Sequence, residues 1–143
     1  MKEDAIIIIG TIGIDIHSWG MRFIEYALKQ EGFKVVTLGV QVSQEEFVDA
    51  ARETNAAAIL VSSLGGHALF DCEGLRERCV EAGLGDILLW IGGNLAVGDV
   101  PWEQVEQQLK SLGFDRVYPP SVLPPQIVAD LKSDLEARGY RVP

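Results

Sequence analysis

The chain has 143 residues, 48% of them hydrophobic and 23% charged, which is ordinary globular composition with enough apolar residues for a substantial core. Its formal net charge of −9 argues against nucleic acid and anionic membrane surfaces as partners, since both attract clustered Lys and Arg. No apolar run approaches the length of a membrane span, and the start of the chain lacks the long apolar core and cleavage site of a signal peptide. We expect a soluble cytoplasmic protein with a single domain over residues 1–143.

Apolar runs alternate with amphipathic stretches five times along the chain. We expect strands at 5–9, 33–38, 57–62, 87–91 and 115–118. We expect helices at 19–31, 43–53, 71–82, 102–112 and 125–138. Five strand-then-helix units with short connections predict an α/β fold, a flavodoxin-like (Rossmann-type) five-stranded parallel sheet flanked by helices.

Three of the helices carry signals of their own. In the first, Phe23 and Leu28 belong to one apolar stripe that we expect to face the core. In the second, Ser43-Gln-Glu-Glu46 has the form of a capping box. On the third, Cys72 and Cys79 would lie roughly 10 Å apart, which is too far for a disulfide. We therefore expect reduced thiols that serve in packing.

Ligands of such parallel sheets bind beyond the carboxyl ends of the strands, where the strand order reverses. The functional residues are therefore expected in the five segments that follow the strands. These segments are 10–18, 39–42, 62–68, 92–100 and 119–122.

The first of these segments contains an acid and a histidine two residues apart, Asp15 and His17. In extended backbone, both side chains leave on the same side. A carboxylate that accepts the proton of one ring nitrogen fixes the tautomer and makes the other nitrogen a better metal ligand. The spacing alone leaves open a loop histidine that lies beside an acid by chance.

Glycine pairs occur in two further segments, at Gly65-Gly66 and Gly92-Gly93. Without Cβ atoms, these positions would let a large planar group approach the backbone closely. Each pair is also compatible with an ordinary tight turn.

The sequence lacks the residues that several common functions of this fold require. A receiver domain needs an acid at the end of the third strand and a lysine at the end of the fifth, where Ser62-Ser63 and Tyr118-Pro119 stand. The Gly-x-Gly-x-x-Gly fingerprint of dinucleotide binding and the Gly-x-Ser-x-Gly elbow of hydrolases are absent from the sequence.

Three of the post-strand segments together form a recognisable signature. Asp15-x-His17-x-x-Gly20 is followed after 41 residues by Ser62-x-Leu64 and after 27 more by Gly92-Gly93. This resembles the cobalamin-binding module shared by glutamate mutase, methylmalonyl-CoA mutase and methionine synthase. The segments 71–77 and 113–120 resemble the small subunit of glutamate mutase (methylaspartate mutase) in particular.

The resemblance implies a cobalamin bound with its dimethylbenzimidazole base displaced from cobalt and replaced by His17, the metal ligand. Asp15 would hold the other ring nitrogen, and the displaced nucleotide tail would enter a slot between the sheet and the first helix. No catalytic residue is assigned to this chain. The residues implied in cofactor binding are Ile14, Asp15, Ile16, His17, Ser18, Gly20, Ser62, Ser63, Leu64, Gly92, Gly93, Asn94, Leu95, Ala96, Val97, Gly98 and Tyr118.

The implied cofactor is adenosylcobalamin, and the implied reaction is the radical interconversion of L-glutamate and L-threo-3-methylaspartate. A larger barrel-type catalytic subunit would supply the substrate site, with a heterotetramer as the expected assembly. The loop around His67 would face the corrin or this subunit, although a solvated loop histidine stays open. Two other readings also stay open, a cobalamin carrier or sensor without mutase activity and a flavodoxin-like domain that binds no cobalamin.

Overall fold

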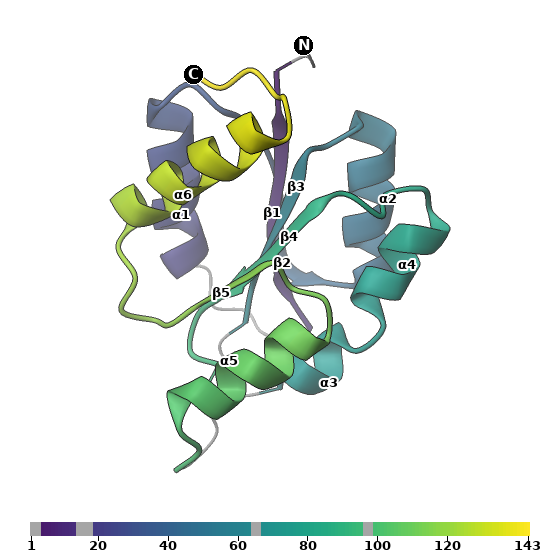
Figure 1. Ribbon diagram of the computed structural model, residues 1–143, viewed down its shortest axis with the longest axis vertical. Helices are drawn as coiled ribbons and strands as arrows, with labels where there is room; N and C mark the ends of the chain where they lie inside the picture. The colour runs from purple at the N-terminus through teal and green to yellow at the C-terminus, as the bar shows by residue number, and fades with distance from the viewer. Residues whose placement is uncertain (1–3, 14–18, 64–66, 96–98) are drawn as a thin grey trace.

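The protein is built around one parallel β-sheet (Figure 1). The computed structural model describes residues 4–13, 19–63, 67–95 and 99–143. The strands lie in the order β2-β1-β3-β4-β5, so the order reverses at β1, between β2 on one side and β3 on the other. Their bounds are β1 (Ile6–Ile12), β2 (Lys34–Val42), β3 (Ala58–Ser62), β4 (Leu88–Gly92) and β5 (Arg116–Tyr118).

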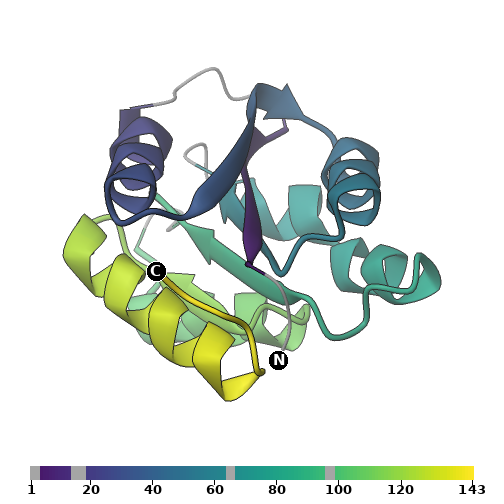
Figure 2. The ribbon, with the colours of Figure 1, turned by 90° about the horizontal axis from the view of Figure 1, so that it is seen from above.

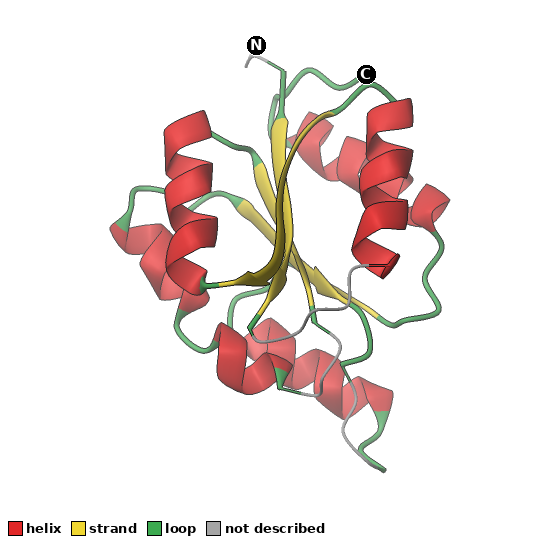
Figure 3. Ribbon diagram, turned by 180° about the vertical axis from the view of Figure 1, so that it is seen from behind, coloured by secondary structure: helices red, strands yellow, loops and turns green. Residues whose placement is uncertain are grey.

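Helices cover both faces of the sheet (Figures 2 and 3). One face carries α1 (Trp19–Gln30) and α6 (Pro124–Ala137), and we call it the α1/α6 face. The opposite face carries the other four helices, α2 (Gln44–Thr54), α3 (Ala68–Cys72), α4 (Leu75–Glu81) and α5 (Trp102–Ser111). The predicted flavodoxin-like α/β architecture is thereby confirmed.

The sheet has a hydrophobic core on each face because its central strands are apolar on both sides. In β1, Ile7 and Ile9 enter the core of the α1/α6 face, while Ile8 and Ile12 enter the opposite core. All four side chains are at most 2% exposed. Burial of each such side chain contributes about 1.5–3 kcal/mol, which is why a continuous apolar run folds as a covered central strand.

Local signals in the sequence begin and end the helices as expected. The Ser43 hydroxyl accepts a hydrogen bond from the Glu46 backbone N–H at 3.1 Å, and the Glu46 carboxylate accepts one from the Ser43 N–H at 3.2 Å. This capping box satisfies two backbone donors at the start of α2. Gly32 follows α1 with a φ of 96°, the left-handed conformation in which glycine ends a helix.

Two strands are longer than the sequence predicted. The prediction that Gly10 ends the first strand is wrong, because β1 continues to Ile12 and pairs there with Val42 of β2. The prediction of a loop at 39–42 is wrong for the same reason. Gly10 pairs with both neighbouring strands, and a Cβ there would lie 3.2 Å from the buried ring of Phe47, so glycine eases the close packing of α2 on the strand.

The predicted third helix, 71–82, is wrong. It is divided into α3, which ends at Cys72, and α4, which begins at Leu75. Gly74 separates them with a φ of 86°, which α-helical backbone excludes. Cys72 and Cys79 consequently belong to different helices, and both are free and fully buried in the core, where they serve in packing.

The predicted inward position of Phe23 on α1 is also wrong, since its side chain is 62% exposed. The predicted burial of Leu28 is confirmed, and Met21, seven residues before it on the same side of the helix, is buried as well. None of the helices in the described ranges is both long and apolar enough to cross a membrane.

Candidate functional site

Four residues form a row across the carboxyl edge of the sheet. Thr11 of β1 is paired with Ser62 of β3, Ser62 with Gly92 of β4, and Gly92 with Tyr118 of β5. Side chains alternate along strands, so this row lies on the same side as Leu60 and Trp90, which belong to the core of the α1/α6 face. The row therefore brings together Ser62, Gly92 and Tyr118, three residues predicted for the site.

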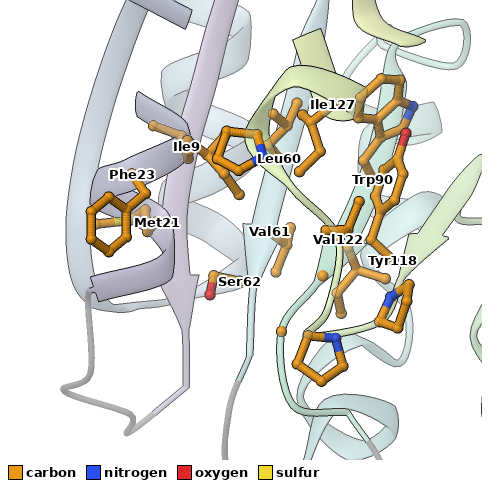
Figure 4. Close-up of a pocket in the computed structure, with 17 residues that line it drawn as sticks. Ile9, Met21, Phe23, Leu60, Val61, Ser62, Trp90, Tyr118, Val122 and Ile127 are labelled. Atoms are coloured by element: carbon orange, nitrogen blue, oxygen red, sulfur yellow. The ribbon is translucent and has the colours of Figure 1, made fainter. Parts of the chain in front are cut away.

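Beneath this row lies a cavity of about 330 Å³ between the sheet, α1 and the start of α6 (Figure 4). Its volume is at the low end of the ~300–1,000 Å³ typical of small-molecule sites. Its lining is mostly apolar and comes from β1, β3, β4, β5, α1 and α6. The residues that line it are Ile9, Met21, Phe23, Ile24, Leu60, Val61, Ser62, Trp90, Ile91, Gly92, Gly93, Tyr118, Pro119, Pro120, Val122, Pro124 and Ile127.

The glycines of β4 and its following turn keep the cavity open at the sheet edge. A Cβ on Gly92 would lie 3.4 Å from the Cβ of Tyr118, in the space between Ser62 and Tyr118. Gly93 has a φ of 117°, which residues with a side chain rarely adopt. A flat group could thus lie directly against the backbone here, as the sequence predicted for a glycine pair at this edge.

The lining of the cavity is mostly apolar, and its hydroxyl-bearing residues, among those that the structure describes, are Ser62 and Tyr118. Thr11 is buried and its hydroxyl donates to the Met21 sulfur at 3.7 Å. Ser62 lines the cavity, and Ser63 is 2% exposed, with its backbone N–H donating to the Gly92 carbonyl. Such a site suits a flat, largely apolar group whose polar end stays at the rim.

Tyr118 is held by Asp130 of α6 and by Trp90 of the neighbouring strand β4. Its hydroxyl donates to Asp130 Oδ2 of α6 at 2.6 Å, and its ring meets the Trp90 ring edge-on with centroids 5.5 Å apart. Burial, and after it the hydrogen bond to Asp130, raises the pKa of the phenol well above its ordinary value. The side chain therefore stays a neutral hydrogen-bond donor throughout the physiological range.

The remaining predicted site residues that the structure describes are not among those that line the cavity. Gly20 lies in the first turn of α1, Asn94 is exposed, and Leu95 is buried in the core of the opposite face, away from the cavity. The other predicted positions lie outside the described residues. They are Ile14, Asp15, Ile16, His17, Ser18, Leu64, Ala96, Val97 and Gly98.

The residues of α6 and β5 that hold Tyr118 in place behind the cavity wall were not predicted from the sequence. Asp130 and Asp134 are spaced four apart beside the buried stripe of α6, and they face Arg116 of β5. That spacing places two carboxylates on one side of a helix, which was the available signal. Nothing in the sequence alone says that Arg116 and Tyr118 lie opposite them.

Comparison with known proteins identifies the family. Residues 5–117 match the family model described as the B12 binding domain. The chain is 54% identical over 135 residues to the glutamate mutase sigma subunit of Carboxydothermus hydrogenoformans, covering 94% of this chain and 98% of that protein. The chain belongs to the family of glutamate mutase sigma subunits.

Other members and neighbours agree with this assignment. The sigma subunit of Clostridium tetanomorphum glutamate mutase is 49% identical over 133 residues, covering 93% of this chain and 97% of that protein. A solved cobalamin-binding protein from Desulfitobacterium hafniense superposes with a TM-score of 0.74 at 25% identity, covering 91% of this chain. This chain spans only 58% of that longer one.

Proposed function

We propose that this sigma subunit family member binds adenosylcobalamin base-off with His17 as the lower cobalt ligand. In this proposal it acts with a larger barrel-type subunit, as a heterotetramer, in the interconversion of L-glutamate and L-threo-3-methylaspartate. The observation that carries the proposal is the apolar cavity at the carboxyl edge of the sheet. The segment 14–18, with Asp15 and His17, joins β1 to α1, and both elements line this cavity.

The cavity fits the nucleotide tail of a cobalamin rather than its corrin ring. A corrin is too large for about 330 Å³, whereas a dimethylbenzimidazole base is flat, bicyclic and apolar like the cavity lining. The missing side chain of Gly92 leaves room for such a ring beside Tyr118. A base accommodated here is removed from cobalt, which frees the lower position for a protein ligand.

The roles of the chain's own residues follow from this arrangement. The Asp15 carboxylate would fix the imidazole tautomer of His17 and strengthen its free nitrogen as a ligand. Ser62 and Tyr118 would line the tail, and the apolar walls from α1 and α6 would exclude water from it. Homolysis of the cobalt–carbon bond is the chemistry that adenosylcobalamin supplies when bound.

The substrate site is assigned to the partner subunit. The apolar cavity on the α1/α6 face is assigned to the tail. On the opposite face, Leu69 and Phe70 of α3 expose 40% and 81% of their side chains beside the segment that follows β3. We assign these apolar side chains and the exposed His67 next to them to the contact with the larger subunit.

The test combines the full chain with a larger glutamate mutase subunit and adenosylcobalamin, and follows 3-methylaspartate formed from L-glutamate. The proposal predicts turnover with the wild-type chain and its loss in His17→Ala. A matched control, His67→Ala, removes the other histidine of the sequence and should keep His17-dependent cofactor binding. Cobalamin retained without turnover would favour a carrier or sensor, and no retained cobalamin would contradict the proposed cofactor.

A further inference from the structure

A cluster of four side chains joins β5 to α6 behind one wall of the cavity. Arg116 donates two hydrogen bonds to Asp134, at 2.7 and 3.0 Å, and forms an ion pair with Asp130 at 3.5 Å. Tyr118 donates to the same Asp130 carboxylate at 2.6 Å. Asp130 therefore accepts from Tyr118 and pairs with Arg116 at the same time.

Arg116 makes this arrangement of charges stable. Two carboxylates four residues apart on a helix repel each other, and the single positive charge of the guanidinium that contacts both offsets part of this repulsion. The guanidinium carbon also lies 5.7 Å from the centre of the Trp90 ring, which forms the cavity wall with Tyr118. The cluster thus fixes the position of the Asp130 carboxylate relative to the sheet.

The ring of Tyr118 faces the cavity on one side and is packed against other side chains elsewhere. Its side chain is 7% exposed, the Trp90 ring meets it edge-on, and both residues line the cavity. Interiors are close-packed, so a released ring would move into the open space beside it. Without its hydrogen bond, Tyr118 would narrow the space that the proposed function gives to the nucleotide tail.

We propose that Asp130 is a positioning residue for cofactor binding, which pins the Tyr118 hydroxyl and so holds the tail cavity open. The inference rests on the proposed function, because it concerns the same cavity. Asp130 has no role in the cobalt ligation that His17 is proposed to provide. Its effect should therefore be confined to cofactors that carry a nucleotide tail.

The experiment uses two probes that differ in the tail, adenosylcobalamin and adenosylcobinamide, which lacks it. Affinities for the full chain are measured from absorbance titrations. For Asp130→Ala we expect about tenfold weaker binding of adenosylcobalamin, the effect of losing one charge-assisted hydrogen bond, and unchanged binding of adenosylcobinamide. Asp130→Asn keeps an acceptor for the phenol and should restore most of the affinity.

Asp134→Ala is the matched control for simple anchoring of α6. Asp134 is on the same helix, pairs with the same Arg116 and makes two hydrogen bonds to it. It should lower the free energy of unfolding without a tenfold loss of adenosylcobalamin affinity. Equal losses in Asp130→Ala and Asp134→Ala, or equal losses for both probes, would overturn the inference.

Tyr118→Phe provides a second route if Asp130→Ala does not fold. This variant removes only the hydroxyl, so it should also weaken adenosylcobalamin binding about tenfold, and adding Asp130→Asn should weaken it no further. Unchanged affinity in Tyr118→Phe would contradict the positioning role. A wild-type chain that retains no cobalamin would instead refute the proposed function itself.

Discussion

Gly92→Val is expected to fill the cavity while leaving the fold intact. Gly92 is the last residue of β4 and has the backbone of an ordinary strand residue rather than a positive φ. Its added Cβ would meet the Tyr118 Cβ at 3.4 Å, a normal van der Waals contact. Valine also favours strands, whereas glycine weakens them, so the thermal midpoint should stay unchanged or rise.

The loss of binding can be worked from the buried area. A bicyclic aromatic group buries about 150–250 Å². At ~25 cal/mol per Å², its burial contributes about 4–6 kcal/mol to binding. A valine side chain beside Tyr118 would exclude roughly half of this group, so adenosylcobalamin should bind about 2–3 kcal/mol more weakly, or roughly 30- to 150-fold.

The assay is the same absorbance titration with adenosylcobalamin and adenosylcobinamide, alongside thermal unfolding. Gly85→Val is the matched control, because Gly85 precedes β4 at the opposite end of the strand and its added Cβ would lie 3.8 Å from Val80. This control should bind both probes like the wild type. A Gly92→Val chain that folds and binds adenosylcobalamin with unchanged affinity would refute the assignment of the cavity to the tail.

Four further predictions concern the fold outside the cavity. Gly74→Ala should lower the free energy of unfolding by about 1 kcal/mol in urea, because φ is 86° and a Cβ has open space. Gly113→Ala should lower the free energy of unfolding by more than Gly74→Ala does, since its Cβ would lie 2.6 Å from the Cβ of Arg76. Equal losses in the two variants would contradict this prediction. Arg76→Met should lower the free energy of unfolding by about 2–4 kcal/mol, because Arg76 donates to three backbone carbonyls and to Asp115. Cobalamin affinity should not change, because Arg76 lies on the opposite face of the sheet from the cavity. Burial raises the pKa of the Cys72 thiol from 9.0 to about 12 in the folded protein, so as pH rises the thiol of the unfolded chain ionises at a lower pH than that of the folded one. The contribution of this thiol to the free energy of unfolding is therefore fully present below pH 9 and should be lost as pH rises to 12. A free energy of unfolding that stays flat over this window would contradict the burial argument.

The fold was largely predictable because its signals are local. The run from Ala5 to Ile9 is apolar on both faces, and the Ser43 capping box begins its helix where the sequence indicates. The errors in the predicted ends of strands and helices lie at glycines, whose structural role depends on residues far away in the sequence. Gly10 continues its strand by pairing with the strands on both sides, and Gly74 divides a helix that the apolar spacing joined.

The position of the candidate site was predictable in part, from the topology of the sheet rather than from local signals. The row of Ser62, Gly92 and Tyr118 follows from strand ends that meet at one edge of a parallel sheet. The family resemblance implied a slot between the sheet and the first helix, but the pattern of residues alone does not show a cavity, because its apolar lining has the same pattern as ordinary core. Asp130 was hidden as well, since an acid on a partly exposed helix face is common and its partner Tyr118 lies on another element. The single domain over 1–143, the role of His17 and a cytoplasmic location stay predictions.

The central claim is that a protein histidine replaces the cofactor's own base on cobalt. The most direct measurement is the electron paramagnetic resonance spectrum of cob(II)alamin bound to the chain, with and without ¹⁵N-labelled histidine. We expect that labelling turns the triplet superhyperfine pattern into a doublet and that His17→Ala abolishes this change. A triplet that persists with labelled histidine would show that the cofactor keeps its own base and that His17 is not the cobalt ligand.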